Sequence, residues 1–174
     1  MTNDTRAIFW DIDGTLIPFG AEAPCEQDRT ALLRARAAGH KVLINTGRSS
    51  GFLPPVLRTA DYLDGFLCGC GTQLIIGGKT LFKQEIPREA LRQVLAYFLE
   101  SPGEGCFFEG ETALLTIKRT HPQGQMLTRA DDFDTRFAGE SVTKLTIWGA
   151  PTQQQRRLLA PWFDLICSER WYEA

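Results

Sequence analysis

Two short apolar runs that each end in a polar motif constrain the fold of this chain most. Residues 7–10 (AIFW) lead directly into DIDGT (11–15), and residues 40–45 (HKVLIN) lead into the motif NTGR (45–48). The stretch between them, 25–39, has apolar residues at helical spacing and ends in a glycine, which is typical of a helix C-terminus. A strand, a helix and a second strand with short connections predict a βαβ unit with parallel strands.

The pattern after residue 70 predicts antiparallel pairing. Gly77 and Gly78 join two alternating runs, which indicates a β-hairpin within 72–86. The further expected elements are a short helix near 49–60 interrupted by two prolines, a strand at 63–69, a helix over 88–100, a hairpin over 106–118, a strand at 142–149 and a helix over 151–163. We therefore predict an α/β fold with a parallel sheet domain over 1–86 and an α+β domain over 87–174.

Composition and charge limit the classes of partner. The formal net charge is −2, and the sequence pI is about 5.7, so the basic excess typical of nucleic-acid-binding proteins is missing. The sequence has no apolar run of bilayer length, and its start, MTNDTR, does not resemble a signal peptide. Five scattered cysteines favour reduced thiols over a disulfide framework. These features predict a cytoplasmic protein whose partners are small molecules, with no nucleic acid and no membrane among them.

The two aspartates of DIDGT are the strongest candidates for catalysis. We interpret 7–10 as a central strand of a parallel sheet, and the loop leaving its carboxyl end would open onto the crevice where α/β proteins bind ligands. Asp11 would attack a phosphorus atom and form an acyl-phosphate. A close like charge raises the pKa of one carboxyl, so Asp13 would carry the proton that a leaving alkoxide needs and later take one from water. Either aspartate taken alone is equally consistent with a simple helix cap.

The same loop predicts a magnesium site. Two carboxylates facing a phosphate need a cation, and oxygen ligands favour Mg²⁺, held by Asp11 and by the main-chain carbonyl of Asp13. Gly14 would allow a backbone angle closed to other residues and let amide groups approach the phosphate. Thr15 begins the next turn, and we include Gly14 and Thr15 among the phosphate-binding residues.

The motif NTGR predicts the other half of a phosphate site. Thr46 follows the neighbouring strand, and its hydroxyl would donate to a phosphoryl oxygen, while Gly47 would present its N–H group. Arg48 would pair with the substrate. The alternative interpretation is a plain helix N-cap made by Thr46 or Ser49.

Together, DIDGTL and NTGR, about thirty residues apart, resemble motifs of the haloacid dehalogenase (HAD) superfamily of aspartate-nucleophile phosphatases. The later segment LDGFLCGCGTQLIIGGKTLFKQEIP resembles the Cof-type subgroup, whose cap domain is of class IIB. The resemblance implies a Rossmannoid parallel-sheet core with an inserted α+β cap that closes over the substrate. It also implies Mg²⁺-dependent hydrolysis of a small phosphorylated metabolite, such as a sugar phosphate, through an aspartyl-phosphate.

Three departures from the family pattern leave an alternative open. Cys70 stands where the subgroup has asparagine, and neither the later lysine motif nor the acidic GDxxND-type motif of the superfamily is found. We interpret Lys144 and the acids Asp131, Asp132 and Asp134 as cap surface. The chain is then expected to be a truncated version of a longer enzyme. The alternatives are an incomplete relative that binds Mg²⁺ and phosphate or acts as an interaction module, and a phosphomutase with the same nucleophile.

Overall fold

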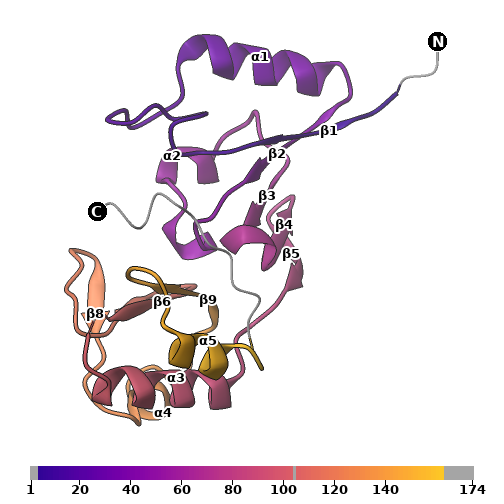
Figure 1. Ribbon diagram of the computed structural model, residues 1–174. Helices are drawn as coiled ribbons and strands as arrows, with labels where there is room; N and C mark the ends of the chain where they lie inside the picture. The colour runs from indigo at the N-terminus through magenta and orange to yellow at the C-terminus, as the bar shows by residue number, and fades with distance from the viewer. Residues whose placement is uncertain (1–3, 104, 163–174) are drawn as a thin grey trace. The chain divides into compact units, whose positions relative to one another are not determined.

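The computed structural model describes residues 4–103 and 105–162 and divides into two compact units, Met1–Gln84 and Glu85–Ala174 (Figure 1). Each unit has its own sheet and its own apolar core. The change from a parallel α/β pattern to an α+β pattern agrees with the predicted fold class. The assignment of residues 1–86 as a catalytic core and 87–174 as a cap stays a prediction.

The first unit is built on a five-stranded sheet with the order β1-β2-β3-β4-β5. The strands β1, β2 and β3 are parallel to one another, and β4 is antiparallel to both of its neighbours, β3 and β5. The elements of this unit are β1 (Ala7–Trp10), α1 (Glu26–Ala37), β2 (Lys41–Asn45), the 3₁₀ turn η1 (Ser50–Phe52), α2 (Pro55–Arg58), β3 (Gly65–Cys68), the 3₁₀ turn η2 (Gly69–Gly71), β4 (Gln73–Ile76) and β5 (Lys79–Lys83). The predicted βαβ unit is therefore confirmed.

Local sequence explains where the elements of the first unit begin and end. The thiol of Cys25 accepts a hydrogen bond from the N–H of Asp28 and caps α1, and Gly39 takes a left-handed φ of 90° just after the helix. Gly77 and Gly78 also have positive φ values, 54° and 75°, as a tight hairpin turn between β4 and β5 requires. The short α2 begins at Pro55, where proline is favoured.

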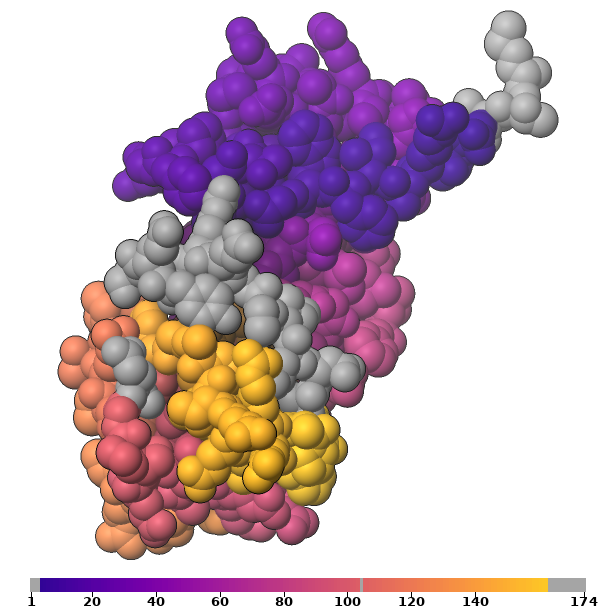
Figure 2. Space-filling view, viewed as in Figure 1, coloured from indigo at the N-terminus to yellow at the C-terminus, as the bar shows by residue number. Residues whose placement is uncertain are grey.

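Strand β1 lies at the edge of this sheet, so its interpretation as a central, covered strand was wrong for the described part of the chain. It pairs with β2 on one side, and among residues 4–103 and 105–162 no strand pairs with its other side. Side chains alternate along a strand, so Ile8 and Trp10 are half-buried while Phe9 is 52% exposed. Figure 2 shows this N-terminal strand, in indigo, on the surface of the first unit.

The second unit packs helix α3 on a four-stranded sheet with the order β8-β7-β6-β9. Its elements are α3 (Arg88–Glu100), β6 (Cys106–Gly110), β7 (Leu114–Thr116), β8 (Gly124–Met126), α4 (Asp132–Thr135), β9 (Val142–Ile147) and α5 (Gln153–Leu159). The core of the unit includes Phe98, Phe108 and Phe133, all fully buried. The predictions of α3, of the β6–β7 hairpin, of β9 and of α5 are confirmed, whereas β8 and α4 were not predicted. The segment 168–174, expected from the family resemblance to form the final cap strand, lies outside the described residues.

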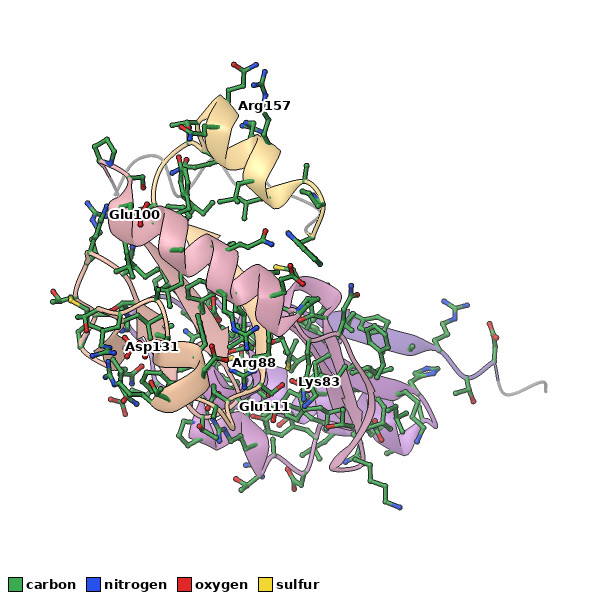
Figure 3. The ribbon with its side chains drawn as sticks, turned by 90° about the horizontal axis from the view of Figure 1, so that it is seen from below. Lys83, Arg88, Glu100, Glu111, Asp131 and Arg157 are labelled. Atoms are coloured by element: carbon green, nitrogen blue, oxygen red, sulfur yellow. The ribbon has the colours of Figure 1, made fainter. Side chains whose placement is uncertain are left out.

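One arginine connects α3 to the segment before β9. Arg88, at the start of α3 and labelled in Figure 3, donates hydrogen bonds to the main-chain carbonyls of Phe133, Phe137, Ala138 and Glu140. These carbonyls lie in α4 and in the segment between α4 and β9, which Arg88 thereby ties to α3. Across the described ranges, no helix is both long enough and apolar enough to span a bilayer.

Candidate active site

The DIDGT motif forms a tight loop at the carboxyl end of β1. The N–H groups of Leu16 and Ile17 donate to the carbonyls of Asp11 and Ile12, at 3.1 and 2.9 Å. Ile12, Leu16 and Ile17 are buried in the core of the first unit, and they anchor the loop. The residues between these anchors, Asp11 and Asp13 to Thr15, are exposed. The apolar positions thus fix the loop while both carboxyl groups face solvent.

Gly14 supplies the backbone geometry of this loop. Its φ is +76°, and a Cβ atom placed on it would lie 2.6 Å from the ring of Phe19. Its N–H donates to the carbonyl of Ile17 at 2.9 Å, so that group is already used within the loop. The contact with Phe19, whose side chain is 77% exposed, was not predicted, because nothing in the local pattern indicates it. A role of Gly14 and Thr15 in phosphate binding stays a prediction.

The side chain of Thr15 turns back toward the predicted nucleophile. Its hydroxyl Oγ1 donates to Oδ2 of Asp11 across 3.4 Å, which is a long hydrogen bond. This contact engages one of the two carboxylate oxygens of Asp11. The Asp11 carboxylate is therefore oriented by its own loop.

The NTGR motif forms a second loop at the end of β2. Thr46 is 3% exposed; its N–H donates to the carbonyl of Leu67 at 2.9 Å, and its Oγ1 accepts from the N–H of Arg48 at 3.2 Å. Gly47 is exposed at the tip. Ser49 precedes η1 without a side-chain capping bond, and the Thr46 hydroxyl serves the loop itself, so the structure does not support the plain N-cap interpretation.

An ion pair joins the two loops. Arg48 donates from Nε to Oδ2 of Asp13 at 2.9 Å and from Nη2 to Oδ1 at 2.6 Å, in a bidentate arrangement. The hydrogen bonds from Arg48 hold the pKa of Asp13 below its ordinary value, although partial burial opposes this shift. The prediction that Asp13 has a raised pKa, caused by Asp11, was therefore wrong. Sequence reasoning assigned Arg48 to the substrate and missed this pair, because two residues 35 positions apart give no local signal.

Cys70 lies against the second loop. Its N–H donates to the carbonyl of Thr46 at 3.1 Å, and a Cβ atom on Gly47 would lie 3.5 Å from its sulfur. Its φ is +58°, a left-handed conformation that asparagine adopts more readily than most side chains. The structure thus places a thiol beside Gly47 at the position where the resemblance led us to expect an amide.

The oxygen atoms of the first loop fit a hard divalent cation. Hydrogen bonds within residues 11–17 use the carbonyls of Asp11, Ile12 and Ile17, and not that of Asp13. The Asp11 carboxylate and the Asp13 carbonyl therefore offer two oxygen ligands, and Mg²⁺ commonly takes few protein ligands together with water and phosphate. Within the described residues, no three or more His, Cys, Asp or Glu side chains form a metal-binding group.

The charged residues interpreted as surface in the second unit have structural partners. Lys144 is 24% exposed and pairs with the nearly buried Glu109 at 2.7 Å. Asp132 is fully buried, so its interpretation as surface was wrong: its Oδ2 accepts from the N–H groups of Thr128 and Arg129. Asp131 and Asp134, by contrast, pair with arginines at the surface.

Comparison with known proteins finds a matching family model and a similar bacterial protein. The family model described as haloacid dehalogenase-like hydrolase matches residues 8–146. YkrA of Bacillus subtilis (strain 168), provisionally named a phosphatase, is 26% identical over 176 aligned residues, which cover 98% of this chain and 66% of YkrA.

Solved structures share the fold. The HAD subclass IIB sugar phosphatase BT4131 superposes with a TM-score of 0.67 at 24% identity, over 90% of this chain and 63% of that one. BT1666 from Bacteroides thetaiotaomicron, described among phosphatases of the HAD superfamily, gives a TM-score of 0.69 at 19% identity, over 92% of this chain and 61% of its own. The chain thus spans less than two thirds of the length of each of these relatives.

Proposed function

The chain belongs to the haloacid dehalogenase-like hydrolase family, and from this membership we propose that it acts as a Mg²⁺-dependent phosphatase through an aspartyl-phosphate at Asp11. The substrate is a small phosphorylated metabolite of the sugar-phosphate type. One observation carries the proposal: the Arg48–Asp13 ion pair brings the DIDGT and NTGR loops to the same edge of the sheet. The residues predicted separately from two motifs therefore belong to one site.

The chemistry divides between the two aspartates. The Asp11 carboxylate attacks phosphorus, the bond from phosphorus to the leaving oxygen breaks, and Asp13 gives that oxygen a proton. Asp13, now a carboxylate, then takes a proton from a water molecule that attacks phosphorus and releases inorganic phosphate from Asp11. The proton that Asp13 gains in the second step is the one that it gives in the first step of the next turnover, so Asp13 returns to its starting state. The ion pair with Arg48 favours the carboxylate form that the second step uses.

Two further groups support this chemistry. Bound Mg²⁺, held by the Asp11 carboxylate and the Asp13 carbonyl, would neutralise charge on the phosphate. The Thr46 hydroxyl accepts from Arg48, so its own hydrogen is available to a phosphoryl oxygen at the buried end of the site. Thr46 and the exposed Gly47 are therefore the proposed hydrogen-bond donors of the second loop to the phosphate.

The substrate class rests on charge and on the relatives. A chain with a net charge of −2 has no basic surface excess for nucleic acid, which favours a small phosphate ester. BT4131 is described as a sugar phosphatase, and this gives the sugar-phosphate class its support. The second unit is the proposed cap that selects the substrate.

A second candidate function is binding of Mg²⁺ and phosphate without turnover. One feature of the described residues favours it: they contain no group of three or more His, Cys, Asp or Glu side chains that could hold a metal ion. Fewer fixed charges at the site would leave less electrostatic stabilisation for a transition state.

Hydrolysis of p-nitrophenyl phosphate by the chain, with and without Mg²⁺, tests the proposal. We expect Mg²⁺-dependent release of nitrophenol that Asp11→Asn abolishes. The matched control Asp61→Asn, which changes an exposed carboxyl in the same unit, should retain the activity. Equal activity of Asp11→Asn and the wild type would refute the nucleophile. Phosphate binding without turnover in the wild type would favour the second candidate.

A further inference from the structure

Arg48 is held by hydrogen bonds at its main chain and at the far end of its side chain, although the residue is half-exposed. Its N–H donates to the Thr46 hydroxyl at 3.2 Å, and its carbonyl accepts from the N–H of Gly69 at 2.8 Å. At the far end of the side chain, Nη1 donates to the carbonyl of Phe52 at 3.2 Å. The guanidinium that meets Asp13 is therefore held by neighbours on its own side of the site.

The fork that Arg48 makes with Asp13 fixes the plane of that carboxylate. Both oxygens are engaged, at 2.9 and 2.6 Å, so rotation of the carboxyl group would break one of two charge-assisted hydrogen bonds. An ionised carboxylate has about four lone-pair positions, and the fork uses two of them. The remaining positions stay open for the proton that Asp13 gives to the leaving oxygen and later takes from water.

A direct role of Arg48 in phosphate binding is less consistent with this geometry. The two Asp13 oxygens and the Phe52 carbonyl take three of the five guanidinium N–H donors, so a phosphate that took the pair of donors now facing Asp13 would displace the Asp13 carboxylate. The Asp13 carboxylate would then face the phosphate without its counter-charge, and two close anions repel each other. With Arg48 in place, the pair is neutral overall and does not oppose the anion.

We infer that Arg48 is a positioning residue for Asp13 and not a phosphate ligand, and that it keeps its bidentate contact when phosphate binds. This inference rests on the proposed function, because it assigns Arg48 within the same site. It replaces the role that the motif alone suggested for this arginine.

The first test observes the arginine itself by NMR of the full chain labelled with ¹⁵N. The Nε–H signal of Arg48 should be protected from exchange in the wild type, lost in Asp13→Asn, and unchanged when inorganic phosphate and Mg²⁺ are added. The Nε–H signal of Arg29, an exposed arginine of the same unit, serves as the reference that Asp13→Asn leaves unaltered. A wild-type Arg48 signal that is unprotected, or that shifts on phosphate addition, would overturn the inference.

The second test compares binding and turnover in variants. Calorimetry with inorganic phosphate and Mg²⁺ should give Arg48→Lys an affinity within about threefold of wild type, whereas Thr46→Val should lose about tenfold, the effect of one lost hydrogen bond to a charged group. Turnover of p-nitrophenyl phosphate by Arg48→Lys should show a reduced kcat and a KM close to wild type. Equal losses of phosphate affinity in Arg48→Lys and Thr46→Val would contradict the inference.

The outcomes also separate the inference from the proposed function. A wild-type chain that binds no phosphate in the presence of Mg²⁺ would overturn the proposed function, and the NMR signal without phosphate would still decide whether Arg48 holds Asp13. A protected Arg48 signal that persists in Asp13→Asn would refute the positioning role even in an active enzyme. The matched variant Arg29→Lys should equal the wild type in phosphate affinity and in turnover.

Discussion

Gly14 offers a quantitative test of the loop that carries both aspartates. Its φ of +76° is a left-handed conformation, and a Cβ atom added there would meet the Phe19 ring at 2.6 Å. Replacement by alanine therefore imposes two separate costs, one for the backbone angle and one for displacing the ring. The variant Gly20→Ala isolates the backbone cost, because the φ of Gly20 is +84° and a Cβ atom there would have no neighbour within 4 Å.

The expected magnitudes follow from these two environments. A left-handed backbone costs a non-glycine residue about 1–2 kcal/mol, partly offset by about 0.4–1 kcal/mol from the lower entropy of the unfolded chain. Gly20→Ala should therefore destabilise the first unit by about 1 kcal/mol. Phe19 is exposed and can rotate away, at an off-rotamer cost of about 0.5–1.5 kcal/mol. Gly14→Ala should accordingly destabilise by about 2 kcal/mol.

Urea denaturation, monitored through the amide NMR signals of β2, measures the free energy of unfolding of the first unit. The Phe19→Ala background should reduce the effect of Gly14→Ala to that of Gly20→Ala, because the ring is then absent. The reasoning is refuted if Gly14→Ala is no more destabilising than Gly20→Ala, or if the Phe19→Ala background leaves the difference intact.

Three further predictions concern thiols and the core of the second unit. Burial raises the pKa of Cys68 to about 11, so at pH 8 a thiol reagent followed by mass spectrometry should label the exposed Cys70 rapidly and Cys68 slowly; equal rates would contradict the described burial. Burial opposes the charge of Asp132, but hydrogen bonds from Thr128 and Arg129 keep the pKa of its carboxyl below the ordinary value. The ionised carboxylate therefore stabilises the fold above the unfolded pKa of about 4, and this stabilisation is lost as the pH falls through the folded pKa. Asp132→Ala should thus cost about 2–4 kcal/mol at pH 7 and less at pH 3 by urea denaturation, and a pH-independent cost would refute this. Phe133→Ala removes a fully buried ring in edge contact with Phe108 and should cost about 3–5 kcal/mol; a loss below 1 kcal/mol would show that this ring is not in the core.

Regular elements with strong local signals were predictable from the sequence. Helix α3 has apolar residues at helical spacing and was predicted with its observed bounds, and the Gly77-Gly78 pair indicated the β4–β5 hairpin. Strand β8 has three residues and α4 has four, too few to show a period, so both were missed. The edge position of β1 was also beyond the sequence, because a run of apolar residues predicts a strand but not its neighbours.

The candidate site was predictable in its residues but not in their contacts. The motifs gave Asp11, Asp13 and Thr46 as candidates, and the structure brings the two loops together. The pairing of Arg48 with Asp13 depends on how β1 and β2 end at the same sheet edge, which is tertiary information. The same holds for Asp132, whose burial depends on the packing of the short helix α4 and not on its acidic neighbours.

Trapping of the covalent intermediate tests the central claim most directly. The chain is mixed with p-nitrophenyl phosphate and Mg²⁺, quenched in acid within the first turnover, and digested for mass spectrometry. The account predicts a phosphoryl group on the peptide that contains Asp11, and none on that peptide in Asp11→Asn. A phosphoryl group on another residue, or nitrophenol release with no phosphorylated peptide at any quench time, would contradict an aspartyl-phosphate at Asp11.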